Sequence, residues 1–414
     1  MITIDPIARA LVAADSAAAA ALGAPNYDEF QSDREVWELL QSRPSSVLRV
    51  TMPHCDVAAP GQILEAESEA SLERAARNMA RLAASPLTRE VRGLLWLYEI
   101  RSGSRPGARQ IGLGGMARTS EIRTPTNPQG PILRNEGVRE AKARGRARLT
   151  EATRTDMGTV NNAVDDESGA FTAALEEQAA AHAPDLESVD EAGNGHRVWL
   201  VTDPGSVDRL RGALRREPRA YVADGNHRSA AAAMLGTPRF QAVFFPAKMM
   251  RIAPYNRLVA ATAAPLRDVP AAVGASFEAE RYEGDGALQP TRTHEIGLYD
   301  GTGWWRLRPR AGTFDAEDAA QDIDADIVQR RLFAEVLGIA DARDDRLTFV
   351  GANRDAEWLR AEVDSGRFRL AVTLPPVTMD QFIRVCRQDR LMPPKSTWFE
   401  PKIRSGLVMA LLDP

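Results

Sequence analysis

Apolar residues recur at helical spacing in some segments of the chain, and alternate or run together in others. The helical spacing predicts amphipathic helices over residues 33–41, 69–85, 206–217 and 322–339. Alternating or continuous apolar residues predict strands over residues 46–52, 92–102, 111–119, 197–203, 219–224 and 240–247. An Asp-Gly pair at 300–301 predicts the turn of a hairpin over residues 294–310. Together these elements predict an α+β fold built on a mixed sheet.

A proline-rich stretch over residues 123–132 separates the first elements from a basic segment, 133–153, which we predict to be a helix. The chain has 414 residues, a length typical of two or three domains. We therefore expect three regions. They are an N-terminal α/β region over residues 1–120, a central core over residues 121–260, and a C-terminal α+β region over residues 261–414.

The overall composition narrows the class of protein. Hydrophobic residues make up 44% and the net charge is −5, so we expect no nucleic-acid partner and no membrane span. Two cysteines, Cys55 and Cys386, cannot form a disulfide framework, which predicts a reducing, cytoplasmic setting. His54 stands beside Cys55. We interpret the two as residues of a loop or of the buried core rather than as a catalytic pair, because no third partner is evident in the sequence. The sequence predicts no oligomeric state.

The stretch RAYVADGNHRSAAAAMLG, residues 219–236, places an acid, a glycine, an imidazole and a guanidinium where a strand meets a helix. The first N–H groups of a helix have no intrahelical partner and favour an anion. Gly225 lets the backbone approach a phosphate, and His227 and Arg228 add donors. Asp224 would repel a phosphate unless a divalent cation lay between them, which makes Asp224 a candidate Mg²⁺ ligand.

The same residues are also compatible with a plain turn, in which Asp224 or Asn226 caps the helix and the basic side chains face solvent. A second stretch, GNGHRVW over residues 193–199, has the same residue types but leads into a strand. It offers no helix N-terminus, so we interpret it as a loop. The motif alone therefore leaves both interpretations open.

Four segments in order carry a resemblance to known proteins. VADGNHRSAAA resembles the Asp-Gly-His-His-Arg signature of free-serine kinases in the ParB/sulfiredoxin superfamily, and still more a bacterial family filed as domain of unknown function 1015. Residues 23–53 resemble the Pro-Pro-Tyr-Asp opening of that family. Residues 130–149 resemble its Ile-x-x-His-Glu element, and residues 392–412 resemble its Pro-Lys-Ser-Thr tail. The resemblance implies a ParB/sulfiredoxin-like core over residues 121–260.

The resemblance also implies an activity: transfer of a phosphoryl group from ATP or ADP, with Mg²⁺, to the hydroxyl of a free amino acid, serine or a related metabolite. Glu136 matches the general base of the kinases. The residues implied for catalysis beside it are Asp224 and His227. Those implied for nucleotide binding are Gly225, Asn226, His227, Arg228 and Ser229. Those implied for the acceptor are Asn135, Lys395, Ser396 and Thr397. We expect Glu136, Asp224 and Lys395 to share one cleft.

Two positions depart from the family pattern, because Asn135 and Asn226 stand where it has histidines. An asparagine amide can donate to phosphate but cannot titrate near neutral pH. A second hypothesis is therefore a nucleotide-binding switch or scaffold without kinase activity. A sulfiredoxin-type reductase is disfavoured, because that chemistry needs a cysteine where this chain has Asn226.

Overall fold

The computed structural model describes residues 1–261, 266 and 268–412. The chain forms two compact units. Unit 1 consists of Met1–Arg134, Val138–Met250 and Pro401–Pro414, and unit 2 consists of Asn135–Gly137 and Arg251–Glu400. The three regions expected from the sequence stay a prediction, and the third of them includes residues 262–265, 267 and 413–414, which lie outside the described residues.

Unit 1 is built on a twelve-stranded sheet with the main order β5-β10-β7-β11-β4-β3-β2-β20-β6. Its strands are β1 Ile4–Asp5, β2 Ile7–Ala13, β3 Thr88–Arg101, β4 Arg109–Arg118, β5 Ile132–Leu133, β6 Thr155–Asp156, β7 Val160–Val164, β8 Leu186–Val189, β9 Gly195–Val201, β10 Ala220–Asp224, β11 Arg239–Pro246 and β20 Val408–Leu411. The pairs β5–β10 and β7–β11 are parallel, whereas the other pairs of this sheet are antiparallel. The expected α+β fold with a mixed sheet is confirmed.

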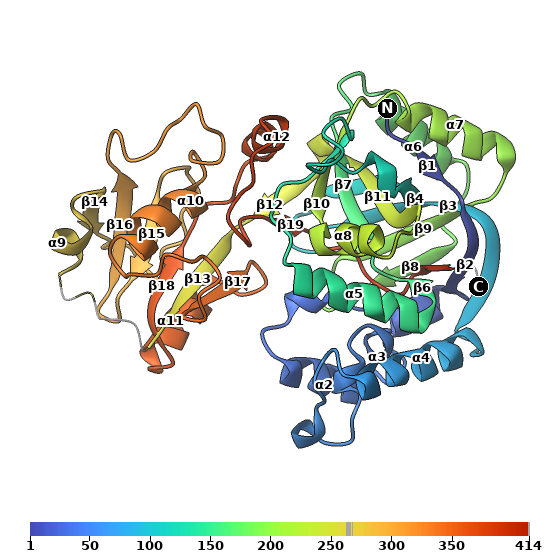
Figure 1. Cartoon of the computed structure of the whole chain (residues 1–414), viewed down its shortest axis with the longest axis horizontal. Coiled ribbons are helices and arrows are strands. Elements are labelled where there is room, and N and C mark those ends of the chain that lie inside the picture. The colour runs from blue at the N-terminus through green and yellow to red at the C-terminus, as the bar shows by residue number, and fades with distance from the viewer. Residues whose placement is uncertain (262–265, 267, 413–414) are drawn as a thin grey trace. The chain divides into compact units, whose positions relative to one another are not determined.

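The helices of unit 1 are shown in Figure 1. They are α1 Ser16–Leu22, α2 Asp33–Ser42, α3 Leu48–Thr51, α4 Glu69–Ala83, α5 Glu140–Thr153, α6 Ala170–Ala180, α7 Pro204–Leu214 and α8 Asn226–Met234. Helices α1, α2, α4 and α7 begin after an Asp or Ser side chain that caps the helix. Single turns of 3₁₀-helix lie at η1 Tyr27–Glu29, η2 Pro53–Cys55, η3 Pro60–Gln62, η4 Thr119–Glu121 and η5 Ala247–Met249. Helix α8 packs against α5 and follows directly on β10, which places its N-terminus at the carboxyl end of that strand.

Glycines allow two central strands to approach closely. The strands expected over residues 92–102 and 111–119 are β3 and β4, which pair antiparallel, and Trp96 of β3 pairs with Gly114 of β4. A Cβ on Gly114 would meet the indole of Trp96 at 2.0 Å, so only glycine leaves room for that ring. The apolar core between the sheet and helices α6 and α7 then fills with side chains such as Phe171, Leu210 and Phe244.

Two sequence predictions of local structure were wrong. The expected strand over residues 46–52 is the short helix α3, because Val47, Leu48 and Val50 are all buried in a helical core cluster rather than on one face of a sheet. The expected helix over 133–153 begins only at Glu140, and the residues before it extend through β5 and the 135–137 segment. The GNGHRVW stretch leads into a strand as predicted, although that strand, β9, begins already at Gly195.

Unit 2 has a six-stranded antiparallel sheet in the order β14-β16-β15-β18-β13-β17 and a separate pair of β12 and β19. Its strands are β12 Arg251–Ala253, β13 Tyr255–Ala260, β14 Phe277–Arg281, β15 Ile296–Tyr299, β16 Trp304–Pro309, β17 Leu347–Gly351, β18 Phe368–Thr373 and β19 Trp398–Glu400. Its helices are α9 Val269–Val273, α10 Asp324–Val328 with the π-helical turn η6 Gln329–Ala334, α11 Ala356–Asp364 and α12 Met379–Arg387. The predicted Asp-Gly hairpin is confirmed as β15–β16.

Among the described residues, no helix has both the length and the apolar character needed to cross a membrane.

Candidate functional site

The predicted junction of strand, glycine turn and helix is present in unit 1. Asp224 ends β10, and α8 begins at Asn226. Gly225 has φ +105°, a conformation that side-chain-bearing residues rarely adopt. A Cβ at this position would also lie 3.0 Å from Nε of Arg228 and 3.2 Å from the backbone of Val160. The glycine therefore brings the start of the helix close to β7 and to the guanidinium of Arg228.

Asp224 is held between two cations. Nη2 of Arg228 lies 3.0 Å from one oxygen of the Asp224 carboxylate, and Nζ of Lys402 lies 3.1 Å from the other. Lys402 also contacts Asp28 at 3.1 Å, so one buried ammonium joins two carboxylates. Burial raises the pKa of Asp224, but Lys402 and Arg228 outweigh it and hold that pKa below its usual range. Asp224 is therefore ionised, and the charge at the junction is balanced within the chain.

This pairing bears on the predicted Mg²⁺ site. Magnesium binds carboxylate oxygens and keeps several waters, whereas both oxygens of Asp224 already face a cationic side chain. The residues around Asp224 fit a carboxylate neutralised by lysine and arginine better than a magnesium ligand. Asp224 as a metal ligand stays a prediction.

Two further residues of the motif have structural contacts in this state. Nε2 of His227 accepts a hydrogen bond of 3.0 Å from the backbone N–H of Arg139, which precedes α5. Ser229 is fully buried, and its hydroxyl donates to the carbonyl of Asn226 at 3.1 Å. His227 thus ties the start of α8 to the start of α5. Roles for His227, Ser229 and the buried Asn226 in nucleotide binding stay predictions.

A pocket of unit 1 opens beside this junction. Its lining combines the guanidinium groups of Arg146 and Arg228 with Tyr27 and the small residues Gly158, Ala231 and Ala232. Arg146 lies over the ring of Tyr27, 3.9 Å from its centroid, and its best hydrogen bond is one of 3.4 Å to the carbonyl of Thr51.

The charge of Arg146 is not neutralised by a direct ion pair among the described residues. Burial lowers the pKa of Arg146 and the charge of Arg228 acts in the same direction, whereas Tyr27, Asp28 and Glu67 act in the opposite direction. The guanidinium groups of Arg146 and Arg228 line this pocket together with the carboxylate of Asp156, and guanidinium groups so placed can bind an anion.

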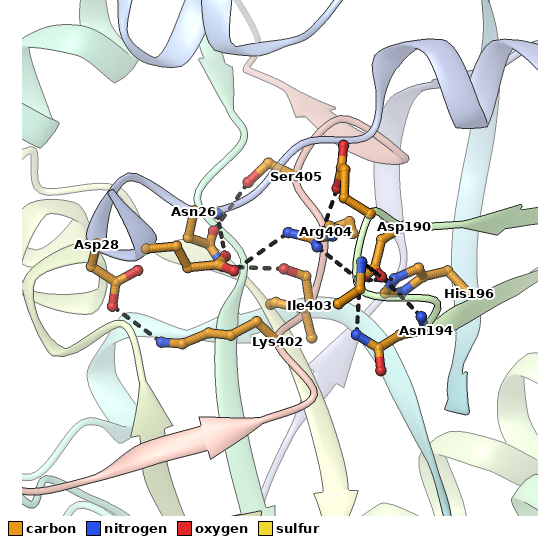
Figure 2. Close-up of polar contacts among 12 residues, drawn as sticks. Asn26, Asp28, Asp190, Asn194, His196, Lys402, Ile403, Arg404 and Ser405 are labelled. Carbon is orange, nitrogen blue, oxygen red and sulfur yellow. Dashed lines mark hydrogen bonds and ion pairs between the residues drawn. The ribbon is translucent and has the colours of Figure 1, made fainter. Parts of the chain in front are cut away.

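A buried network continues from Lys402 along the C-terminal segment (Figure 2). Nη2 of Arg404 lies 2.7 Å from Asp190, and Nη1 lies 3.4 Å from Glu29. Asn26 donates to the carbonyl of Ile403 at 3.1 Å and accepts from the hydroxyl of Ser405 at 3.1 Å. Burial outweighs these cations at Glu29 and raises its pKa to about 7. The network fixes the segment after Pro401 against the turn that carries Tyr27 and Asp28.

His196, from the stretch set aside as a loop, belongs to this network. Tyr98 accepts from the N–H of Arg404 at 3.0 Å, and its hydroxyl lies 2.8 Å from Nδ1 of His196. Nε2 of His196 lies 3.0 Å from Asp190. Burial lowers the pKa of His196 despite Asp190, so the ring is neutral, with its proton directed to Asp190. This histidine is structural, as the absence of a following helix indicated.

In unit 2 the structure brings together two segments that the sequence separates widely. The backbone N–H of Lys395 donates to Oε2 of Glu136 at 3.3 Å, across 259 residues. The amide of the buried Asn135 lies 3.5 Å from the hydroxyl of Thr397. The hydroxyl of Ser396 donates to the carbonyl of Pro393 at 2.7 Å. The predicted base and the predicted acceptor residues therefore share one part of unit 2.

Arg257 is a residue of this part that sequence reasoning missed. It is buried on β13, and its Nη1 donates to the carbonyl of Tyr255 at 2.7 Å. Burial lowers its pKa to about 10, while the carboxylate of Glu136 acts in the opposite direction. Within the described residues, Arg257 forms no ion pair with a carboxylate. It is thus a buried cation near Glu136 that can neutralise a bound anion.

The structure thus groups the predicted residues in two sets. Asp224, Gly225, Asn226, His227, Arg228 and Ser229 lie in unit 1, and Asn135, Glu136, Lys395, Ser396 and Thr397 lie in unit 2. The expectation of one cleft for both sets stays a prediction. The residues that sequence reasoning missed are Lys402, Arg257 and the Arg404 network. The sequence pointed to Lys402 only through its place in the stretch PKIRS, which comes shortly after the Pro-Lys-Ser-Thr motif.

Comparison with known proteins gives a family and several distant structures. A family described as "Protein of unknown function (DUF1015)" matches residues 4–332. No curated protein matches the chain. Among solved structures, "Free serine kinase in complex with AMP" has 10% identity and a TM-score of 0.37, over 65% of this chain and 83% of that one. A conserved hypothetical protein from Pyrococcus furiosus has 12% identity and a TM-score of 0.35, over 66% and 89%. SbnI with a C-terminal truncation, from Staphylococcus aureus, has 10% identity and a TM-score of 0.36, over 70% and 82%. TM-scores this low do not establish a shared fold.

Proposed function

The chain belongs to the DUF1015 family of proteins of unknown function, and we propose that it is a phosphotransferase that uses ATP or ADP to phosphorylate the hydroxyl of a free amino acid, serine or a related small metabolite. The family description names no activity, so the support comes from the motif resemblance and from the residues themselves. The proposal includes a ParB/sulfiredoxin-like core that carries the nucleotide.

The phosphoryl donor is assigned to unit 1. A nucleotide phosphate carries several negative charges and needs cations and N–H donors that are already in position. The start of α8 supplies N–H groups behind Gly225, and Arg146 and Arg228 line the adjacent pocket. Arg146 supports this assignment most directly, because its guanidinium forms no ion pair with a carboxylate among the described residues. Lys402 keeps Asp224 and Asp28 from repelling the phosphate.

The acceptor is assigned to unit 2. The observation that carries the proposal is the contact of Glu136 with the backbone of Lys395 across 259 residues, because it joins the expected base to the expected acceptor segment. A free amino acid brings a carboxylate, which needs a counter-ion. Arg257 is a buried guanidinium without an ion-pair partner in the described chain, and with Lys395 it can serve that purpose.

The chemistry assigns one role to each group. Glu136 accepts the proton of the acceptor hydroxyl as its oxygen bonds to the terminal phosphorus of the nucleotide. The bond from that phosphorus to the bridging oxygen breaks, and the shortened nucleotide leaves with the electron pair. Arg146 and Arg228 bind the charge on the phosphoryl oxygens. Asn135 orients the segment around Glu136 through Thr397.

A product screen by mass spectrometry tests the proposal. The intact chain is incubated with Mg²⁺ and ATP or ADP, together with serine, homoserine, threonine or a pooled metabolite extract. We expect a new phosphorylated product from the unaltered chain, and none from Glu136→Gln. The matched control is Glu140→Gln, an exposed glutamate paired with Arg144 four residues away, which should leave turnover unchanged.

Nucleotide binding, measured by calorimetry, separates the two halves of the proposal. Glu136→Gln should bind nucleotide as well as the unaltered chain, whereas Arg146→Met should weaken binding at least tenfold, because it removes one charge from the pocket. Turnover that survives in Glu136→Gln would exclude this residue as the base. Tight nucleotide binding with no product from any acceptor would favour the switch or scaffold instead.

A further inference from the structure

Three potential metal ligands meet in unit 1, at the start of α2. Asp33 is the first residue of that helix, and His54 and Cys55 end the turn η2. Nε2 of His54 lies 3.1 Å from Oδ1 of Asp33, and the ligand atoms of all three residues lie within 4.8 Å of one another. Among the described residues, no other group of three or more His, Cys, Asp or Glu side chains meets this criterion.

The three residues differ in their access to solvent. The side chain of Asp33 is 53% exposed, whereas His54 is 7% exposed and Cys55 is fully buried. The thiol and the imidazole thus form the inner wall of the group, and the carboxylate closes it toward solvent. An ion could reach the group from the side on which Asp33 is exposed. On that side a water molecule could occupy the remaining coordination position of the ion.

The backbone around the group is held in place. The indole N–H of Trp37, one helical turn after Asp33, donates to the carbonyl of Val57 at 3.0 Å. The carbonyl of His54 accepts from the N–H of Leu64 at 3.1 Å. The neighbouring Asp56 is engaged elsewhere, by Arg49 and by the amide of Asn78 at 2.8 Å. The helix and the turn are therefore fixed to each other, and Asp56 is not a fourth ligand.

We propose that Asp33, His54 and Cys55 bind one divalent cation of the zinc class. A thiolate selects zinc or cobalt over magnesium and calcium, and imidazole is a common partner of thiolate in such sites. One thiolate and one carboxylate balance the charge of a divalent ion. Three protein ligands and a water complete four coordination, the number that zinc prefers. The sequence alone suggested no third partner for His54 and Cys55, and the fold supplies it in Asp33.

The distances permit such a site after a small adjustment. Typical zinc bonds to sulfur, nitrogen and oxygen place tetrahedral ligands about 3.4–3.6 Å apart. The contact of His54 with Asp33 is already that short, at 3.1 Å. The remaining separations reach at most 4.8 Å, and rotation of the exposed Asp33 side chain together with the thiol closes them. On binding, the thiol of Cys55 releases its proton to solvent and the sulfur bonds to the metal.

Metal titration of the intact chain tests the proposal, independently of any kinase activity. The protein is stripped with a chelator and titrated with Zn²⁺ against a competing chromophoric chelator, and separately with Co²⁺. We expect one zinc per chain and, with cobalt, a sulfur-to-metal charge-transfer band and the intense visible bands of tetrahedral coordination. Cys55→Ser should remove the charge-transfer band and weaken zinc binding at least tenfold. Asp33→Asn, at an exposed position that tolerates change, should weaken it without loss of the band.

The control is Cys386→Ser, which alters the other buried cysteine, on α12 of unit 2. Its zinc stoichiometry and cobalt spectrum should match those of the unaltered chain. Circular dichroism confirms that each variant is folded. A chain that binds no zinc against the chelator would overturn the proposal. The same holds if zinc binding or the cobalt band is unchanged in folded Cys55→Ser.

Discussion

Removal of the charge of Arg404 is the most direct test of the buried network in unit 1. The side chain of Arg404 is 9% exposed and that of Asp190 is 4% exposed, and their ion pair measures 2.7 Å. Arg404→Met keeps most of the apolar stem and removes the guanidinium. Glu29 can respond by taking a proton, because its pKa is already raised to about 7. Asp190 responds less readily. Burial raises its pKa, but the N–H groups of His196 and Asn194 and the charge of Arg404 hold that pKa far below its usual range, and the N–H groups remain in the variant.

The variant therefore leaves one buried carboxylate without its cation. Loss of one partner from a buried ion pair typically costs about 3–5 kcal/mol. Since Asp190 keeps its bonds to His196 and Asn194, we expect the lower end, a loss of about 3 kcal/mol in the free energy of unfolding. Equilibrium unfolding in guanidinium chloride, followed by tryptophan fluorescence, measures the change.

The matched control is Arg34→Met, which breaks an exposed ion pair with Glu38, whose two side chains are 72% and 55% exposed. We expect that change to cost about 0.5 kcal/mol or less. If Arg404→Met cost less than about 1 kcal/mol, the network would not be a buried ion-pair system, and the reasoning from burial would be refuted.

Three other changes are predicted. Glu29 binds a proton in the folded chain up to a pH of about 7, above its ordinary value of 4.5, so its contribution to stability is present at low pH and is lost as the pH rises through about 7. Stability measured from pH 5 to 8 should therefore fall more steeply in the unaltered chain than in Glu29→Gln, and parallel curves would contradict the assignment. Gly114→Ala forces a methyl group into the ring of Trp96 and should lower stability by about 1–3 kcal/mol in chemical denaturation, whereas Gly212→Ala, in open space on α7, should not. Gly225→Ala strains a backbone at φ +105° and crowds Arg228, so calorimetry should show weaker nucleotide binding, and unchanged affinity would exclude the junction as the phosphate site.

Local patterns predicted the elements whose apolar positions follow one period over many residues. Helix α4 and the hairpin of β3 and β4 agree with the sequence to within a few residues, because each buries one regular set of side chains. Short apolar runs did not predict the local structure correctly. Residues 46–52 alternate as a strand would, yet they form α3, because the surrounding core buries Val47, Leu48 and Val50 from several sides.

The candidate site also contains residues that the sequence identified and residues that only the structure revealed. The sequence located the strand–turn–helix junction, since glycine at a positive φ and a following alanine-rich helix leave a local signature at Asp224–Arg228. It also named Glu136 and Lys395, through their resemblance to family motifs. It could not indicate that Lys402 joins Asp224 to Asp28, or that Asp33 meets His54, because no local rule connects residues so far apart in the chain.

By itself, then, the sequence determined the class of fold, the regular elements and the local chemistry of the Gly225 turn, all of which depend on neighbouring residues and backbone preference. The tertiary structure decided which charges meet. Arg146 faces a pocket and forms no ion pair among the described residues, while Arg404 is paired with Asp190, although both are arginines in basic stretches. The physical reason is that the strength of a charge interaction depends on distance and burial, and only the folded chain fixes these two quantities.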